Sequence, residues 1–170
     1  MVLVFSVMNL LLKNKYIYFK DYKLKCAIGK RGITGNKIEG DKCTPKGRFK
    51  LKYVFYRKDR LKKITSKLRF FPIKKNYGWC DDTYSKYYNK FVKLPFKFKA
   101  EKLYLKDNKY DLIVVLDYNL KPVRKNKGSA IFLHIAKRKY LPTLGCVAVS
   151  KKNLKLILSN VTKKTFLKVI

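Results

Sequence analysis

The sequence predicts a mostly β domain with one main helix near its C-terminus, formed by residues 1–170 as a single unit. Residues 48–57 alternate between apolar and polar side chains, which is typical of a strand with one buried face. Residues 110–117 are apolar and β-branched, as in a central strand. Helical spacing of apolar residues is clearest in 151–160. A chain of 170 residues is long enough for a conventional core.

The N-terminal third predicts a strand, a hairpin and a long loop. Residues 1–12 are apolar but too short to span a bilayer, and they lack the basic start and cleavage site of a signal peptide, so we interpret them as a first strand and turn. Residues 16–19 and 22–28 predict a hairpin that turns at Lys20-Asp21. The Gly-, Lys- and Asp-rich residues 29–47 predict a long loop, a kind of segment that is often functional.

The middle of the chain is less regular. Residues 59–72 form a basic connector, and the polar, Tyr-rich residues 76–89 follow. Pro95 argues against one continuous strand or helix through residues 91–98. Residues 119–127 predict a turn that leads from the central strand into the next apolar run.

The C-terminal part predicts short elements in quick succession. Residues 130–133 have the length and composition of a buried strand, and residues 147–149 predict another. Ser150 is placed to cap a helix that begins at Lys151. Residues 165–170 alternate as a closing strand.

One histidine and one cysteine stand out as a candidate catalytic pair. His134 is the chain's single histidine, and Cys146 follows twelve positions later. A cysteine nucleophile reacts as the thiolate and needs a nearby base, for which imidazole is the best suited side chain near neutral pH. The alternative is structural, with a small core cysteine and a hydrogen-bonded core histidine.

The residues around Cys146 favour a sharp turn. Pro142-Thr143-Leu144-Gly145 is a turn pattern, and Gly145 permits a positive φ or a close approach of the backbone to a substrate. Successive backbone N–H groups in such a turn can converge on one point and form an oxyanion hole. We expect the N–H groups of Leu144, Gly145 and Cys146 to supply it.

Two motifs in this chain resemble the L,D-transpeptidase (YkuD-like) family. Residues 143–150 (Thr-Leu-Gly-Cys-Val-Ala-Val-Ser), preceded by 131–134 (Ile-Phe-Leu-His), resemble its catalytic signature. Residues 26–30 together with 39–49 resemble its Thr-Pro-x-Gly-x-Phe region. The resemblance covers nearly the whole chain and implies a YkuD-like β-sandwich.

The chain departs from the more common family pattern at three points. Leu144 stands where a second histidine is usual, and Ala148 stands where Arg or Asn is usual. The spacing from His134 to Cys146 is also shorter than in many members. The motif resembles a divergent branch with a Gly-Cys-Val-Ala core, so the roles of nucleophile and base carry over, whereas contacts made by the missing residues do not.

The resemblance implies a cysteine-dependent L,D-transpeptidase that forms cross-links between peptidoglycan stem peptides through a thioester. Cys146 would attack the carbonyl between the L-centre of the third-position diamino acid and the terminal D-alanine, with His134 as the base. A backbone carbonyl near Ile135 would orient the imidazole. If water resolves the thioester, the same site is an L,D-carboxypeptidase. The resemblance implies no cofactor and no metal, a cell-envelope location and, we expect, a monomer without a membrane span.

Four further residues are candidates for substrate binding: Thr143, Arg57, Asp81 and Tyr88. Acids are scarce here, so Asp81 could bind an amine of the substrate or tie a loop to an arginine such as Arg57. Tyr88 could line a cleft, and core packing is the alternative for any single aromatic side chain.

The four cysteines show no zinc pattern. Cys26, Cys43, Cys80 and Cys146 include no C-x-x-C pair, and with one histidine there is no plausible zinc ligand set. A Cys43–Cys80 disulfide is an open alternative, although nothing in the spacing demands it.

A net charge of +33, with 43 Lys and Arg against 10 Asp and Glu, predicts attraction to polyanions such as nucleic acid, anionic lipid or anionic cell-wall polymers. Interleaved Lys, Tyr and Phe support a second hypothesis, a cationic nucleic-acid-binding module. Sparse arginine and the absence of a known binding motif argue against specific nucleic-acid recognition.

Overall fold

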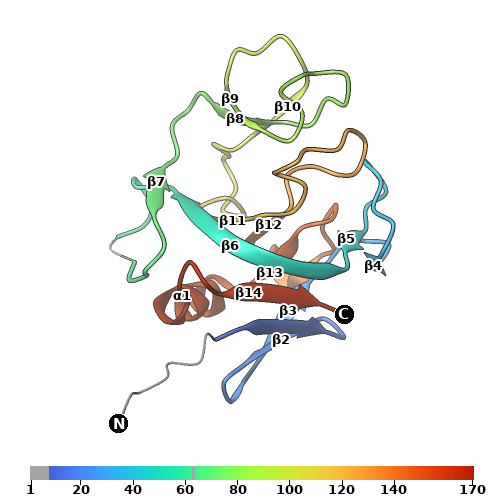
Figure 1. The fold of residues 1–170 in the computed structure, drawn as a ribbon. Helices are drawn as coiled ribbons and strands as arrows, with labels where there is room; N and C mark the ends of the chain where they lie inside the picture. The colour runs from blue at the N-terminus through green and yellow to red at the C-terminus, as the bar shows by residue number, and fades with distance from the viewer. Residues whose placement is uncertain (1–7, 63) are drawn as a thin grey trace.

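The computed structural model describes residues 8–62 and 64–170. It confirms a mostly β fold with a single α-helix near the C-terminus (Figure 1). The strands, in chain order, are β1 (Leu10–Lys13), β2 (Tyr16–Phe19), β3 (Tyr22–Ala27), β4 (Ile33–Thr34), β5 (Thr44–Pro45), β6 (Gly47–Tyr56), β7 (Phe70–Pro72), β8 (Tyr77–Cys80), β9 (Phe91–Lys93), β10 (Ala100–Lys102), β11 (Leu112–Leu116), β12 (Phe132–Ile135), β13 (Val147–Val149) and β14 (Phe166–Val169). The helix α1 spans Lys151–Asn160, and a 3-10 turn spans Arg138–Tyr140.

Nine of these strands form one main sheet that closes on itself. Its order is β11-β12-β13-β3-β2-β1-β14-β6-β7, and β6 also pairs with β11. The ten-residue β6 can do this because its first half pairs with β14 and its second half with β11. Closure leaves fewer unpaired strand edges and encloses an apolar interior.

A smaller upper sheet lies over one end of the main sheet. It consists of β8 between β10 and β9, all antiparallel, and it occupies the top of the view in Figure 1. Pro95 predicts that no continuous strand runs through residues 91–98, and β9 does end at Lys93, two residues before this proline. The loop predicted over residues 29–47 contains the two-residue strands β4 and β5.

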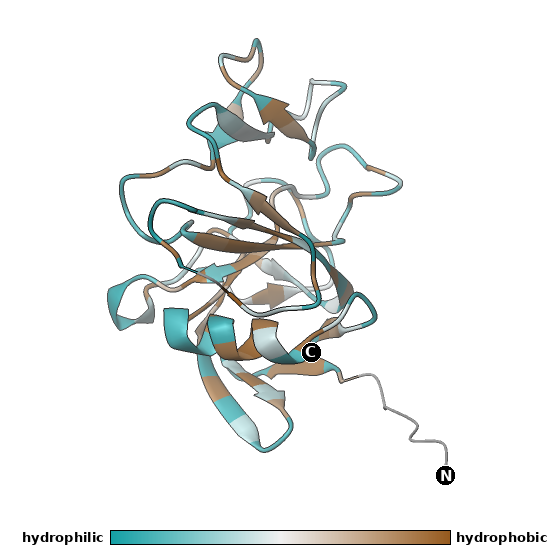
Figure 2. Cartoon of the chain, turned by 90° about the vertical axis from the view of Figure 1, so that its left-hand side faces the viewer, coloured by the Kyte–Doolittle hydropathy of each residue, from teal (hydrophilic) through white to brown (hydrophobic). Residues whose placement is uncertain are grey.

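The core has two parts. Figure 2 shows that the strands of the main sheet are largely apolar, whereas hydrophilic residues are frequent in the loops. The larger part lies inside the main sheet and against α1, which buries Leu154, Ile157 and Leu158. The smaller part lies between the main and upper sheets and includes Trp79, Phe132 and Cys146. The catalytic candidate therefore sits where the two sheets meet.

The helix α1 begins just after the strand that follows Cys146, and its first turn is capped by Ser150. Ser150 accepts a hydrogen bond from the backbone N–H of Asn153 at 3.1 Å, which satisfies one of the free donors of the first turn. This confirms the cap predicted at Ser150, the residue that joins β13 to α1.

The predicted hairpin, the strands at 48–57, 110–117, 147–149 and 165–170, and the helix are confirmed. Of the strand expected within residues 1–12, residues 10–12 belong to β1, and 1–7 lie outside the described residues. The disulfide alternative is wrong, because Cys43 and Cys80 are both free. No helix in residues 8–62 and 64–170 has the length and apolar character needed to cross a membrane.

Candidate active site

Cys146 and His134 line the same cavity, a pocket of about 640 Å³ that we call the Cys146 pocket. One wall comes from β12 and the turn before β13, and another comes from β10 and the residues next to it. The pocket thus lies between the main sheet and the upper sheet. Its lining comes from distant parts of the chain, so no single stretch of sequence defines it.

Two neighbouring parallel strands bring the pair together. His134 on β12 lies beside Ala148 on β13, and Cys146 precedes Ala148 by two residues. Side chains two apart in an extended segment share a face, so the thiol and the imidazole point to the same side of the sheet. The N–H of Phe132 donates to the Cys146 sulfur at 3.4 Å, which aligns Cys146 with the residue two before His134.

The Cys146 thiol is buried and neutral in this state. Only 9% of the residue is exposed, and burial raises the pKa of the thiol to about 12, with the nearby Glu101 carboxylate adding to the effect. The S–H donates to the carbonyl of Ala130 at 3.1 Å. A thiol in this state is protonated at neutral pH, so it can act as a nucleophile only with the help of a base.

His134 is a neutral imidazole oriented by its own backbone. Its Nδ1 donates to the carbonyl of Ile135 at 2.9 Å, which confirms the carbonyl expected there. Nε2 is therefore the nitrogen that can accept a proton. Burial lowers the pKa of His134 to about 4, and the Tyr110 ring packs edge-to-face on it at 5.2 Å. A neutral imidazole at pH 7 is the form that a general base requires.

The turn that carries Cys146 is held by two threonine hydroxyls. Thr143 Oγ1 donates to the Cys146 carbonyl at 2.6 Å and accepts the Gly145 N–H at 3.1 Å. Thr44 Oγ1, from the 29–47 loop, also donates to the Cys146 carbonyl at 3.4 Å. Thr44 of the Thr-Pro motif is thus in direct contact with the backbone of Cys146.

Gly145 is required by the shape of this turn. Its φ is +143°, and a Cβ at this position would lie 2.9 Å from the Cys43 carbonyl oxygen. Any larger residue would push the turn away from the loop beneath it.

The set of donors for an oxyanion differs from the prediction in one respect. The Gly145 N–H is occupied by Thr143 Oγ1. Within the described part of the chain, the N–H groups of Leu144 and Cys146 have no hydrogen-bond partner. Two of the three predicted donors are therefore free to face a substrate carbonyl.

Four charged side chains that line the pocket form two ion pairs. Lys99 contacts Asp81 at 3.1 Å, and Lys109 contacts Glu101 at 3.8 Å.

Leu144 lines the mouth of the pocket and is 77% exposed. The residue that stands in place of the usual histidine therefore offers an apolar contact next to the thiol.

The four predicted substrate residues lie in different places. Thr143 and Asp81 line the pocket, and Asp81 Oδ1 is a buried oxygen without a hydrogen-bond partner in the described residues. Tyr88 is buried and does not line the pocket, but its hydroxyl donates a hydrogen bond to Glu39, whose carboxylate does. Its contact with substrate would therefore be indirect.

The expected role of Arg57 in substrate binding has no support in this geometry. Arg57 is buried away from the Cys146 pocket, where it pairs with Asp59 at 2.6 Å and donates to the Leu105 carbonyl at 2.8 Å. Its guanidinium also stacks on the Tyr104 ring at 3.6 Å. These contacts serve the fold, because a buried guanidinium must find partners for its N–H donors locally.

Residues 8–62 and 64–170 contain no group of three or more His, Cys, Asp or Glu side chains suited to hold a metal ion.

The family model of the L,D-transpeptidase catalytic domain, YkuD, matches residues 7–170. The chain belongs to this family. As a YkuD domain it has an L,D-transpeptidase-family activity on peptidoglycan, and the assignment indicates an enzyme of the cell envelope. Comparison of this YkuD sequence with curated proteins finds no match.

Proposed function

We propose that this YkuD domain cross-links peptidoglycan stem peptides through a thioester on Cys146, with His134 as general base. The observation that carries the proposal is the placement of thiol and imidazole on one face of the β12–β13 pair, in the same pocket. The neutral state of both groups fits a reaction in which the proton moves during attack.

In the first step the Cys146 sulfur attacks the carbonyl that precedes the terminal D-alanine. The thiol proton passes to Nε2 of His134, and the N–H groups of Leu144 and Cys146 stabilise the tetrahedral oxyanion. Each such donor is typically worth about 3–4 kcal/mol. When the intermediate collapses, the C–N bond breaks and His134 returns the proton to the departing amine, which leaves a thioester.

In the second step an amine of another stem peptide attacks the thioester. His134 takes a proton from the amine and passes it to the sulfur as the C–S bond breaks, which restores both the thiol and the neutral imidazole. The burial of both Cys146 and His134 favours an amine held in the pocket over bulk water, because little solvent reaches the thioester. Hydrolysis in place of this step would make the domain an L,D-carboxypeptidase.

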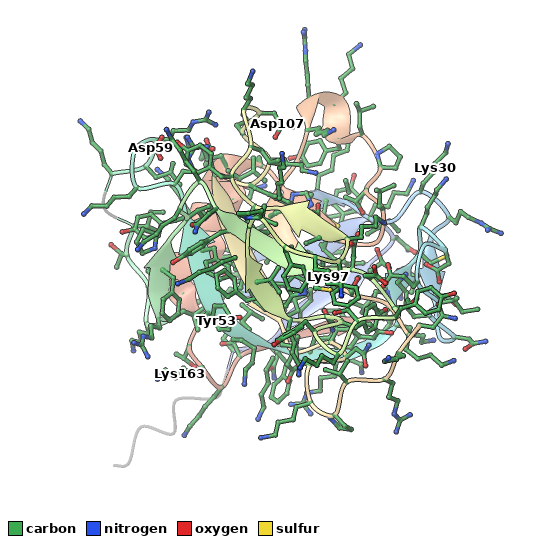
Figure 3. The ribbon with its side chains drawn as sticks, turned by 90° about the horizontal axis from the view of Figure 1, so that it is seen from above. Lys30, Tyr53, Asp59, Lys97, Asp107 and Lys163 are labelled. Carbon is green, nitrogen blue, oxygen red and sulfur yellow. The ribbon has the colours of Figure 1, made fainter. Side chains whose placement is uncertain are left out.

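Binding of nucleic acid is the less favoured function. Figure 3 shows nitrogen-tipped side chains projecting around the whole outline of the molecule, with Lys30 and Lys163 on opposite sides. Such a spread supports general attraction to polyanions, including anionic wall polymers, and defines no single track for a nucleic-acid strand.

Intact-mass spectrometry with a carbapenem and with a defined tetrapeptide stem tests this proposal. Wild-type protein should gain one adduct, and Cys146→Ala should gain none. Cys43→Ala is the matched control, since Cys43 is the more exposed of the other cysteines and should not affect the adduct. Product masses distinguish a cross-linked dimer from a released tripeptide. An unmodified wild type would contradict the assignment of Cys146 as nucleophile.

A further inference from the structure

Ala130, next to the Cys146 thiol, has an unusual backbone conformation. Its φ is +52°, in the left-handed region that residues with a Cβ rarely adopt. The carbonyl of this same residue accepts the S–H of Cys146. The direction in which the thiol proton points therefore depends on a backbone conformation that alanine does not prefer.

Asn89 holds Ala130 in this conformation. The Asn89 side chain is almost fully buried, and its Oδ1 accepts the Ala130 N–H at 3.0 Å and the Trp79 Nε1–H at 2.9 Å. Its Nδ2 donates to the carbonyls of Asn119 at 2.7 Å and Tyr118 at 3.2 Å.

This amide is saturated and has one possible orientation. Two N–H donors face Oδ1 and two carbonyls face Nδ2, so the reversed amide would oppose donor to donor and acceptor to acceptor. Asn89 belongs to the loop that joins β8 to β9, whereas Ala130 leads into β12. The side chain thus ties the upper sheet to the residue that orients the nucleophile.

We infer that Asn89 is a positioning residue for the Cys146 nucleophile, acting through the backbone of Ala130. This inference rests on the proposed role of Cys146. Asn89 does not line the Cys146 pocket and acts only on the direction of the Ala130 carbonyl. Without the Asn89 acceptor, the buried Ala130 N–H would lack a partner and alanine would return to a negative φ. The carbonyl would then turn away, and the sulfur would lose its fixed place relative to His134.

The first test compares Asn89→Leu with Trp79→Phe. Both variants remove a hydrogen bond to the same Asn89 oxygen, but only Asn89→Leu removes the acceptor of the Ala130 N–H. We expect the rate of carbapenem acylation to fall roughly 100-fold in Asn89→Leu, as for other small displacements of a reacting group. Trp79→Phe should lose stability and keep most of its acylation rate. Equal rates in the two variants would overturn the inference.

The second test is rescue by glycine. Glycine adopts a positive φ without the steric cost of a Cβ. Adding Ala130→Gly to Asn89→Leu should therefore raise the acylation rate about tenfold above that of Asn89→Leu alone. A purely structural role of Asn89 predicts the opposite, because an added glycine makes the chain more flexible. A double variant no faster than Asn89→Leu would contradict the proposed action through Ala130.

Infrared spectroscopy gives a readout that needs no substrate. The S–H stretching band of Cys146, isolated as the difference between wild type and Cys146→Ser, should move to higher frequency in Asn89→Leu as the bond to Ala130 is lost. If Asn89→Leu does not fold, Ala130→Val poses the same question with Asn89 intact, since a β-branched residue resists positive φ. An unmoved band would refute the inference, whereas a moved band in a protein that never acylates would refute only the role of Cys146 as nucleophile.

Discussion

Replacing His134 with glutamine should change both the rate of Cys146 acylation and its dependence on pH. With a thiol pKa of about 12, only about one Cys146 in 10⁵ is a thiolate at pH 7. Reaction through the neutral thiol therefore depends on the base, and general-base catalysis is typically worth about 10²–10⁴-fold. We expect His134→Gln to lose a factor of this size at pH 7.

The two proteins should also differ in the shape of their pH profiles. Burial lowers the pKa of His134 from 6.5 to about 4, so the imidazole can accept a proton at any pH above about 4. The wild-type acylation rate should stay level from about pH 5 to pH 9 and fall through pH 4. The rate of His134→Gln should instead rise about tenfold per pH unit, because it follows the thiolate.

Stopped-flow measurement of carbapenem acylation at a series of pH values checks both expectations. Because the chain has one histidine, no other imidazole can produce the acid limb. Glu101 faces the same pocket, and Glu101→Gln is the matched control that should keep the limb near pH 4. A wild-type limb near pH 6.5, or equal rates for wild type and His134→Gln at pH 7, would refute the reasoning.

Three further substitutions, and a stability measurement on His134→Gln, test other parts of the structure. Gly145→Ala should slow acylation roughly tenfold or more, because the new Cβ would meet a backbone oxygen at 2.9 Å and shift the turn. Thr143→Val should slow acylation and cost about 1 kcal/mol of unfolding free energy in urea, since two hydrogen bonds at the Cys146 turn are lost. Arg57→Met should lower the unfolding free energy by about 1–3 kcal/mol and leave acylation unchanged. His134→Gln should resist acid better than wild type, because protonation of the unfolded chain costs the wild type about 3 kcal/mol of stability as pH falls from 6.5 to 4.

Each of these predictions has an opposing result. Unchanged acylation in Gly145→Ala or Thr143→Val would show that the turn does not control the position of the sulfur. Slower acylation in Arg57→Met, with its fold intact by circular dichroism, would return Arg57 to the substrate site. Equal acid sensitivity of His134→Gln and wild type in urea titrations at pH 4.5 and pH 7 would mean that His134 titrates normally in the folded protein.

Elements with a strong local pattern could be predicted from the sequence. The alternation in β6 and the helical spacing in α1 each depend on neighbours along the chain, and the cap at Ser150 depends on a residue three positions away. The placement of Cys146 and His134 in one pocket could also be predicted, because the chain has one histidine and the motif around it resembles a known family.

Features that depend on distant parts of the chain could not be predicted. Arg57 is predicted to bind substrate, but in the folded protein its guanidinium is occupied by Asp59 and the Leu105 carbonyl. Thr44 and Asn89 act on the backbone at residues 146 and 130, across 102 and 41 positions. A hydroxyl or an amide side chain carries no signal in the sequence for a contact with a remote main-chain group.

The closure of the main sheet has a consequence for synthesis. β14 is the strand that links β1 to β6, through a parallel ladder on one side and an antiparallel ladder on the other. On the ribosome, the sheet cannot close until residue 169 has emerged from the exit tunnel. A nascent chain whose β14 is still inside the ribosome therefore carries the strands of the Cys146 pocket on an open sheet.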